Sequence, residues 1–500
     1  MKVTYCASPV LAIREFNVAN RILTENLLRN DKLDVSFNYS ALDCYARYDG
    51  QAYEAMGDIE KHNPQMAQSF SLWKETLRLY LSAYYYPKIF VDSFNNDDII
   101  VMSCQSNYYD YPFIVELLNR GKRLVLGGAN FRIWRTPEFI TNMLLEMGVK
   151  EKYINNFIIV EGMVDLTTDL YEIIKKWKHH VITENDYSTI WDCERDYFQN
   201  IMHSICSVLG LDMKTKNVSS NFVNITFMTN NHCWWGKCKF CGFIKQPKMD
   251  FDTGVEAEKI AQNIINTTKR FDSDRVYFSN DYWVFNEKHK RILEILNGKY
   301  NINCFTGVNM CRREDYLENI NRYNLKYLKV GIEAGTDFAL DKLGKGYGTA
   351  AVDEMISKMV KILDKDVEVT LHSILDAPQQ SQADVVNNYE NYIRWRDTLR
   401  DNGIKSNVVV SSYAIVKEIN DKECIDGNYI RRCNQDDAQS GRIRGLNDLR
   451  TIFGDIIPFD SYSHYIPFNR YDKDGNIMPS DLDILSIDMM KDIYGNWGWK

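Results

Sequence analysis

The feature that most restricts the fold of this chain is the alternation of short β-branched runs with segments of helical pattern. The alternation occurs in residues 1–180 and begins again in 222–425. Because the helix after each strand carries the chain back to the starting edge of the sheet, such a series predicts parallel strands covered by helices. The sequence therefore predicts the α/β class with two parallel-sheet domains. A helical linker is expected at 181–221, and a C-terminal substrate or lid region at 426–500.

The first series predicts an open, Rossmann-like sheet, in which a ligand lies at the carboxyl ends of the strands. Gly127 and Gly128 end one expected strand and have two readings. They let backbone approach a large flat ligand, because glycine has no side chain to obstruct it, or they form a plain strand-to-helix turn. No G-x-G-x-x-G follows the first strand, which argues against a dinucleotide. The expected strands cover residues 1–7, 33–39, 97–106, 122–131 and 156–162, and the expected helices cover 112–121, 136–148 and 168–177.

The second series predicts a partial (β/α)6 barrel, because six expected strands are each followed by a segment of helical pattern. In a parallel barrel the chemistry lies on the loops at the carboxyl ends of the strands. The expected strands cover residues 221–229, 275–281, 301–309, 326–335, 367–378 and 407–416, with long helices at 254–271 and 349–365.

Charge and cysteine usage limit the class of protein. The net charge is −8 with acidic and basic residues mixed along the chain, so no basic face for nucleic acid and no polybasic membrane patch is expected. We expect a peptide or small-molecule substrate instead. The first residues do not form a secretory signal, and no apolar run approaches the ~18 residues of a membrane span. Twelve cysteines in 500 residues indicate reduced thiols, and the chain is expected to be cytoplasmic.

Three cysteines form the only local cluster in the sequence: Cys233, Cys238 and Cys241, on the loop after the first barrel strand. One reading is a zinc site with His232 or a distant cysteine as fourth ligand. Structural zinc usually takes two pairs of ligands, and this sequence has no second pair. An iron-sulfur cube is the other reading, because three thiolates on one tight loop hold three irons and leave the fourth open to a substrate or cofactor.

These residues resemble the radical S-adenosylmethionine superfamily. The likeness consists of cysteines after the first barrel strand, Phe240 immediately before the last of them, and "KVGIEAGTD" on a later strand. Four residues separate Cys233 from Cys238, where three are usual in the family. The pattern "CWWG…C-x-F-CG" and the preceding parallel-sheet domain are similar to the cobalamin-binding branch that modifies ribosomal peptides. The resemblance covers residues 1 to about 425.

The resemblance implies which residues meet each cofactor. Cys233, Cys238 and Cys241 would hold a 4Fe-4S cluster, and Glu333 would meet the ribose hydroxyls of S-adenosylmethionine. A carboxylate suits two neighbouring hydroxyl donors. The full S-adenosylmethionine set is Phe240, Ser279, Asn280, Asp281, Gly331, Glu333, Gly335 and His372, and the cobalamin set is Ser103, Gln105, Ser106, Asn107, Tyr108, Gly127, Gly128, Asn130, Glu161 and Gly162.

The activity implied by the resemblance is methyl transfer to an unactivated carbon. One S-adenosylmethionine would methylate cobalt, and a second would be split to a 5′-deoxyadenosyl radical that takes a hydrogen atom from the substrate. The D-x-H-x-x-G signature that supplies a histidine to cobalt elsewhere is absent, which favours methyl transfer. A reductant such as flavodoxin or ferredoxin is the implied protein partner. The alternatives are a domain that has lost cobalamin, a non-methylating rearrangement or cyclisation, and a cobalamin- or metal-binding sensor.

Overall fold

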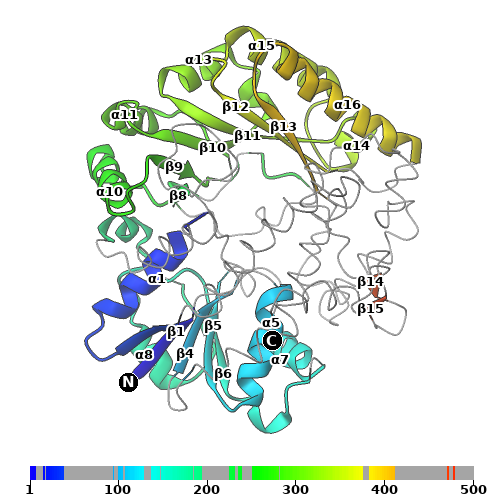
Figure 1. The fold of residues 1–500 in the computed structure, drawn as a ribbon. Coiled ribbons are helices and arrows are strands. Elements are labelled where there is room, and N and C mark those ends of the chain that lie inside the picture. The colour runs from blue at the N-terminus through cyan, green and yellow to red at the C-terminus, as the bar shows by residue number, and fades with distance from the viewer. Residues whose placement is uncertain are drawn as a thin grey trace, which may run out of the picture.

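A computed structural model shows two parallel β-sheets with helices packed against them, which confirms the predicted α/β class (Figure 1). The structure describes residues 1–6, 15–16, 18–38, 94, 99–104, 107–128, 137–146, 148–183, 185–193, 224–230, 233, 235–238, 250–280, 282–374, 382–411, 470–471 and 477–478.

The first sheet has six parallel strands in the order β3-β1-β4-β5-β6-β7. The chain builds outward on one side of β1 with β3 and on the other side with β4, so the topological switch point lies between β1 and β4. This is the strand order of flavodoxin-like sheets, which bind ligands at that point. The strands are β1 (Lys2–Cys6), β3 (Asp34–Asn38), β4 (Ile99–Ser103), β5 (Arg123–Gly127), β6 (Phe157–Glu161) and β7 (His180–Val181), and the helices are α1 (Val18–Arg29), α5 (Asn107–Asn119), α7 (Pro137–Glu146) and α8 (Leu170–Lys176).

The second sheet has the order β13-β12-β11-β10-β9-β8-β2, in which β2 is Glu15–Phe16, and all of its neighbouring strands are parallel. Six of these strands follow one another in chain order, as predicted for a partial barrel. The strands are β8 (Asn224–Phe227), β9 (Arg275–Phe278), β10 (Asn301–Gly307), β11 (Leu325–Glu333), β12 (Glu368–Ile374) and β13 (Ser406–Ser411), and the helices are α10 (Ala257–Arg270), α11 (Glu287–Leu296), α12 (Val308–Cys311), α13 (Glu314–Arg322), α14 (Asp337–Lys342), α15 (Thr349–Ile362) and α16 (Gln382–Asp401).

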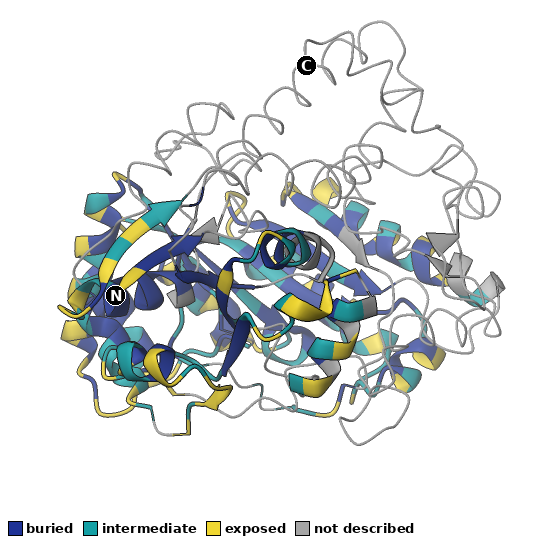
Figure 2. Ribbon diagram, turned by 90° about the horizontal axis from the view of Figure 1, so that it is seen from below, coloured by how far each residue is buried: buried dark blue, intermediate teal, exposed yellow. Residues whose placement is uncertain are grey.

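Alternation along the barrel strands separates an apolar outer face from a polar inner one. Phe278, Leu328 and Val330 are fully buried. Side chains of this register belong to the face that the helices cover, because successive residues of a strand point to opposite faces. Figure 2 shows the strands as largely buried and the exposed residues along the surrounding helices and turns. Tyr277 and Lys329 have the other register and therefore point into the barrel.

The seventh strand of the barrel sheet comes from the N-terminal region and was not expected from the sequence. Strand β2 (Glu15–Phe16) pairs in parallel with β8, with Glu15 opposite Asn224 and Phe16 opposite Ile225. The residues that the sequence assigns to the first domain therefore also supply an edge strand to the second sheet.

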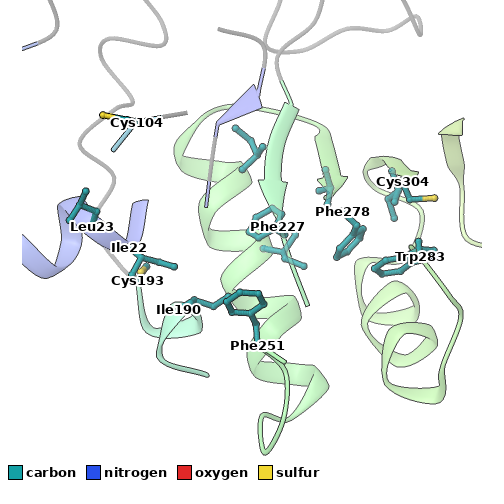
Figure 3. Close-up of a cluster of buried hydrophobic side chains, with 14 of the residues drawn as sticks. Ile22, Leu23, Cys104, Ile190, Cys193, Phe227, Phe251, Phe278, Trp283 and Cys304 are labelled. Atoms are coloured by element: carbon teal, nitrogen blue, oxygen red, sulfur yellow. The ribbon is translucent and has the colours of Figure 1, made fainter. Parts of the chain in front are cut away.

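Helix α1 and the 3-10 helix η4 (Tyr187–Asp192) pack against the first barrel strand. Arg21 of α1 is buried, lies 5.4 Å from the ring centre of Phe227, and donates to Thr267 Oγ1 over 2.9 Å. Trp191 stacks on Phe227 at 6.3 Å and donates to the backbone oxygen of Phe251. Figure 3 shows side chains of α1, η4 and β8 in this cluster. A single apolar core therefore extends through both sheets.

The linker and the C-terminal region lie largely outside the described residues. Within the expected linker the structure shows η4. Near the C-terminus, β14 (Arg470–Tyr471) pairs antiparallel with β15 (Ile477–Met478). Among the helices that the structure describes, none has the length and apolar character needed to cross a membrane.

Candidate functional site at the carboxyl ends of the barrel strands

Two of the three clustered cysteines lie on the loop that follows β8, at the carboxyl-end face of the barrel. Cys238 is buried and Cys233 is partly exposed. Burial raises the pKa of the Cys238 thiol, and the nearby Lys345 ammonium, which is placed to donate to this thiol, opposes the rise. The nearby Glu333 and Cys233 also raise the pKa of the Cys238 thiol. The side chains of Cys233, Cys238, Glu333 and Lys345 therefore form one cluster. The third predicted ligand, Cys241, lies outside the described residues, as do Phe240 and His232.

The cysteine loop is anchored to the turn after α14 through Trp235. The indole nitrogen of Trp235 donates to the backbone oxygen of Gly344 over 3.0 Å. The ring also occupies the space beside Gly346, where an added β-carbon would come within 2.1 Å of it. Lys237 lies over the same ring at 5.2 Å. The loop carrying Cys233 and Cys238 is therefore held against residues 343–348.

Glu333 ends β11 in an unusual backbone conformation. Its φ is 65°, in the left-handed region that residues other than glycine seldom adopt. The pairing with β12 shifts register at this point, since Gly331 pairs with His372 and Glu333 with Ser373. A bulge of this kind re-aims a side chain. The Glu333 carboxylate approaches Gly331 so closely that an added β-carbon there would lie 2.5 Å from Oε1. Gly331 therefore provides room for Glu333 itself.

Two tyrosines hold the bulge in place. The Tyr347 hydroxyl donates to the backbone oxygen of Gly331 over 3.1 Å, and the Tyr392 hydroxyl lies 3.3 Å from that of Glu333 and 2.8 Å from that of Ile374. Burial raises the pKa of Tyr347, so this hydroxyl keeps its proton. An unfavourable backbone conformation persists where the surroundings over-determine it, and such positions cluster at functional sites.

Lys345 is the member of the site that sequence reasoning missed. Its side chain is only 12% exposed, and Nζ lies 3.1 Å from Oε1 of Glu333, whose side chain is equally buried. Burial lowers the pKa of this ammonium, but Glu333, Tyr347 and Cys238 together raise it above its ordinary value. Lys345 is therefore charged. The signal in the sequence is the short glycine-rich run "LGKGYG" at 343–348, which brackets a single lysine.

Asn280, one of the predicted S-adenosylmethionine contacts, is used by the fold. It is buried, its Oδ1 accepts from the Thr229 backbone nitrogen, and its Nδ2 donates to Thr229 Oγ1. Thr229 Oγ1 lies 2.9 Å from His289 Nε2, and His289 Nδ1 lies 2.6 Å from the Val284 backbone oxygen. Because a backbone oxygen only accepts, Nδ1 carries the proton and Nε2 accepts from Thr229. This chain of bonds fixes the backbone that leads into the cysteine loop.

The other predicted S-adenosylmethionine residues divide between packing and the barrel interior. Gly335 lies against α16, where an added β-carbon would be 2.4 Å from the backbone oxygen of Asn388, so it serves close packing. Ser279 caps the end of β8 by donating to the Phe227 backbone oxygen. His372 lies on the inner face, edge-on to the Phe305 ring at 5.5 Å. Asp281 lies outside the described residues.

The inner face of the barrel combines aromatic rings with a cation. Lys329 Nζ lies 4.4 Å from the ring centre of Tyr277, and the Tyr327 hydroxyl is 2.7 Å from Thr370 Oγ1. His372 belongs to the same inner face and pairs in register with Gly331, two residues before Glu333. Convergent polar groups among aromatic rings are typical of a small-molecule site.

The predicted cobalamin residues that the structure describes lie at or just after the carboxyl ends of β4, β5 and β6. The Cys104 backbone nitrogen, next to Ser103, donates to the Gly127 backbone oxygen over 2.7 Å. Gly128 has φ +102°, and a β-carbon there would meet the Cys104 backbone oxygen at 2.3 Å. Gly162 similarly faces Ile182 at 3.1 Å. The described part of this edge therefore favours the reading of these glycines as tight packing of neighbouring loops.

The structure describes only part of the remaining predicted cobalamin residues. Glu161 is partly exposed at the end of β6. Asn107 and Tyr108 begin α5, immediately after β4 and next to the switch point, but their side chains are not among those described. Gln105, Ser106 and Asn130 lie outside the described residues.

Comparison with known proteins shows a likeness at the level of the fold. No protein-family model matches the sequence, and no curated protein matches it either. The cobalamin-dependent S-adenosylmethionine radical enzyme OxsB, solved with aqua-cobalamin and S-adenosylmethionine bound, is similar to 99% of this chain at 13% identity, with a TM-score of 0.48. This chain spans 61% of the length of OxsB.

Two further structures show the range of the likeness. The radical S-adenosylmethionine methyltransferase TsrM from Kitasatospora setae, solved with tryptophan substrate and an S-adenosylmethionine analogue, aligns with 99% of this chain and 89% of its own length, at 9% identity and a TM-score of 0.43. Coproporphyrinogen III oxidase (HemN) from Escherichia coli, a radical S-adenosylmethionine enzyme, aligns with 37% of this chain and 46% of its own, at 11% identity and a TM-score of 0.27.

Proposed function

We propose that this chain is a cobalamin-dependent radical S-adenosylmethionine enzyme that methylates an unactivated carbon. One observation carries the proposal. A loop with closely spaced cysteines follows the first strand of a partial parallel barrel, and it faces the carboxylate of Glu333 and the ammonium of Lys345. Active sites of parallel barrels lie at this end of the strands.

The residues of the loop suit an iron-sulfur cluster. Cys233 is close enough to Cys238 to affect the pKa of the Cys238 thiol, and thiolates are the ligands that such clusters use. The Lys345 ammonium next to Cys238 favours the thiolate that binds iron. Among the described residues no three His, Cys, Asp or Glu side chains are placed so that they could hold a metal ion, so the third ligand is assigned to Cys241 from its spacing in the sequence. When bound, the cluster supplies one electron to S-adenosylmethionine, and cobalamin supplies the methyl group.

The chain's own residues bind and orient the reactants. Glu333 is held by its bulge so that its carboxylate accepts hydrogen bonds from the ribose hydroxyls. Tyr277, Phe305 and Tyr327 form the aromatic part of the barrel interior and exclude water from it. No side chain has to remove a proton, which agrees with a site whose titratable groups are engaged in ion pairs and hydrogen bonds. Geometry is the contribution that the protein makes when cofactors carry the reaction.

The first sheet is the proposed cobalamin site. Its strand order places a switch point between the carboxyl ends of β1 and β4, where flavodoxin-like sheets bind their ligands. A hydrogen bond from the Cys104 backbone nitrogen to the Gly127 backbone oxygen joins the ends of β4 and β5. This bond would keep the edge of the sheet that contacts the ligand in a fixed position.

We further propose a peptide or small natural product as the substrate, with a flavodoxin or ferredoxin as reductant. A reaction that rearranges or cyclises the substrate would use the same site. The mass of the product separates the two, because methylation adds one CH2. A cobalamin- or metal-binding sensor would bind its cofactor without splitting S-adenosylmethionine.

The proposal is tested by anaerobic reconstitution with iron, sulfide and cobalamin, followed by spectra of both cofactors. A dithionite-dependent assay then measures 5′-deoxyadenosine. The Cys238→Ala variant should lose the cluster and the product. The Cys311→Ala variant, which changes a buried thiol at the last position of α12, should keep both. Purified protein that carried zinc bound by four protein groups would contradict the proposal.

A further inference from the structure

The position of Lys345 is set by the end of α14. The backbone nitrogen of Gly344 donates to Asp341 and that of Lys345 donates to Leu340. Gly344 has φ +75°. This is the Schellman arrangement, in which a left-handed glycine ends the helix and the next residue bonds back to its last turn. The lysine therefore leaves the helix in a fixed direction that its flanking glycines determine.

The same turn is fixed from the opposite side by the cysteine loop. Trp235 donates to the Gly344 oxygen and fills the space beside Gly346. Lys345 thus lies between two glycines that are both in contact with the segment carrying Cys238. Its side chain has little freedom, because it is only 12% exposed and its ammonium bonds to Glu333.

We propose that Lys345 is a positioning residue that links the cluster to the S-adenosylmethionine site: its ammonium pairs with Glu333 beside the loop that carries Cys238, favours the reduced cluster, and fixes the carboxylate that receives the ribose. This inference rests on the proposed function. A cluster gains one negative charge when it is reduced, so a fixed cation beside a ligand sulfur raises its reduction potential. The same cation orients the Glu333 carboxylate before the cofactor binds.

The two neighbours of the cluster should therefore act in opposite directions. Removal of the Lys345 charge lowers the reduction potential, whereas removal of the Glu333 charge raises it. Both changes weaken the binding of S-adenosylmethionine, because the first frees the carboxylate and the second removes it. If the Lys345 side chain only filled space, removal of its charge would change neither the reduction potential of the cluster nor the affinity for S-adenosylmethionine in this way.

The test compares Lys345→Met, Lys345→Arg and Glu333→Gln with the reconstituted wild-type chain. The readouts are iron per chain, the midpoint potential from a titration followed by electron paramagnetic resonance, and the dissociation constant of S-adenosylmethionine from equilibrium dialysis. Lys345→Met should lower the potential by about 59 mV, a tenfold change in a one-electron equilibrium. It should also weaken binding about tenfold. Lys345→Arg should restore both, since arginine keeps the charge.

The matched control is Lys342→Met at the last position of α14, where the ammonium lies over the exposed ring of Phe338. It should behave as the wild type does. The inference is overturned if Lys345→Met keeps the wild-type potential and affinity. If Lys345→Met holds no cluster, an arginine variant with a normal potential supports the role of the charge, and an arginine variant without a cluster overturns it. A wild-type chain that binds no cluster refutes the proposed function itself, and this inference with it.

Discussion

Replacement of Glu333 by glutamine tests the central contact of the proposed site. The change keeps the length of the side chain and removes its charge. A hydrogen bond to a charged group contributes about 1.5–3 kcal/mol, compared with about 1 kcal/mol for a neutral pair. Because about 1.4 kcal/mol corresponds to a factor of ten in affinity, the loss of charge at one or two ribose contacts predicts binding that is about 10 to 100 times weaker.

The same substitution affects the stability of the folded chain. Glu333 and Lys345 are each 12% exposed in their side chains, so the variant leaves a largely buried ammonium without its carboxylate. Loss of one partner from a buried pair costs about 3–5 kcal/mol. The exposed fraction and the nearby Cys238 thiol place this pair at the lower end of that range.

Replacement of Glu333 by glycine separates the effect of the backbone conformation on stability from the effect of the side chain. The left-handed conformation costs a residue other than glycine about 1–2 kcal/mol, and Glu333 adopts it with φ 65°. Glu333→Gly should therefore be more stable than Glu333→Gln by about 1 kcal/mol and should still bind S-adenosylmethionine weakly. The backbone conformation itself therefore does not call for glutamate at this position.

The assay is equilibrium dialysis of S-adenosylmethionine against protein of measured iron content. Glu354→Gln is the control, because Glu354 also forms an ion pair, with Arg312, but on the outer helix α15. It should bind as the wild type does. Should Glu333→Gln bind S-adenosylmethionine within twofold of the wild type at equal iron content, the ribose contact assigned to Glu333 would be wrong.

Three further perturbations have effects that follow from packing and protonation. Gly335→Ala should destabilise the chain by about 1–3 kcal/mol in urea unfolding, because its β-carbon would meet the Asn388 backbone oxygen at 2.4 Å. Gly128→Ala should cost more than 1 kcal/mol and weaken cobalamin binding measured by absorbance, since both its φ of +102° and the Cys104 backbone oppose a side chain. Burial lowers the pKa of His289 below its ordinary 6.5, so the unfolded chain takes up this proton first as the pH falls. The contribution of neutral His289 to the free energy of unfolding should be fully present above about pH 6.5 and should decrease below it by at most about 1.4 kcal/mol per pH unit. In the His289→Gln variant, the free energy of unfolding should not show this part of the pH dependence.

The strands and their parallel pairing could be predicted because their signal is local. Runs such as Ile99–Ser103, all of it buried, have the continuous apolar character of strands covered on both faces. The helix at Pro137–Glu146 begins with the proline that the pattern indicated. Strand β2 escaped prediction because two residues have no periodicity, and their pairing with β8 depends on a contact more than 200 residues away in the sequence.

The site was predicted less completely because its decisive features are not local. Glu333 was identified from its motif. Its left-handed backbone, however, results from a shift in the pairing with β12, and the residue types in the sequence do not indicate that shift. Asn280 has the right chemistry for a cofactor contact, yet its amide is bonded to Thr229. Gly128 and Gly335 share one explanation, since each gives space to a neighbouring backbone. A sequence shows that a glycine is required but does not show what approaches it.

The segment from β2 through α1 relates the two proposed cofactor sites. Strand β1 ends at Cys6, at the switch point of the first sheet, and the chain then pairs with β8, whose next loop carries the cysteines. Arg21 of α1 fastens this segment to the barrel through Thr267 and the Phe227 ring. Because these contacts are buried and lie in one continuous core, the switch point and the cysteine loop are held by the same short stretch of chain. Transfer of a group between two cofactors requires such a fixed relation, since a small misplacement of reacting centres costs a large factor in rate.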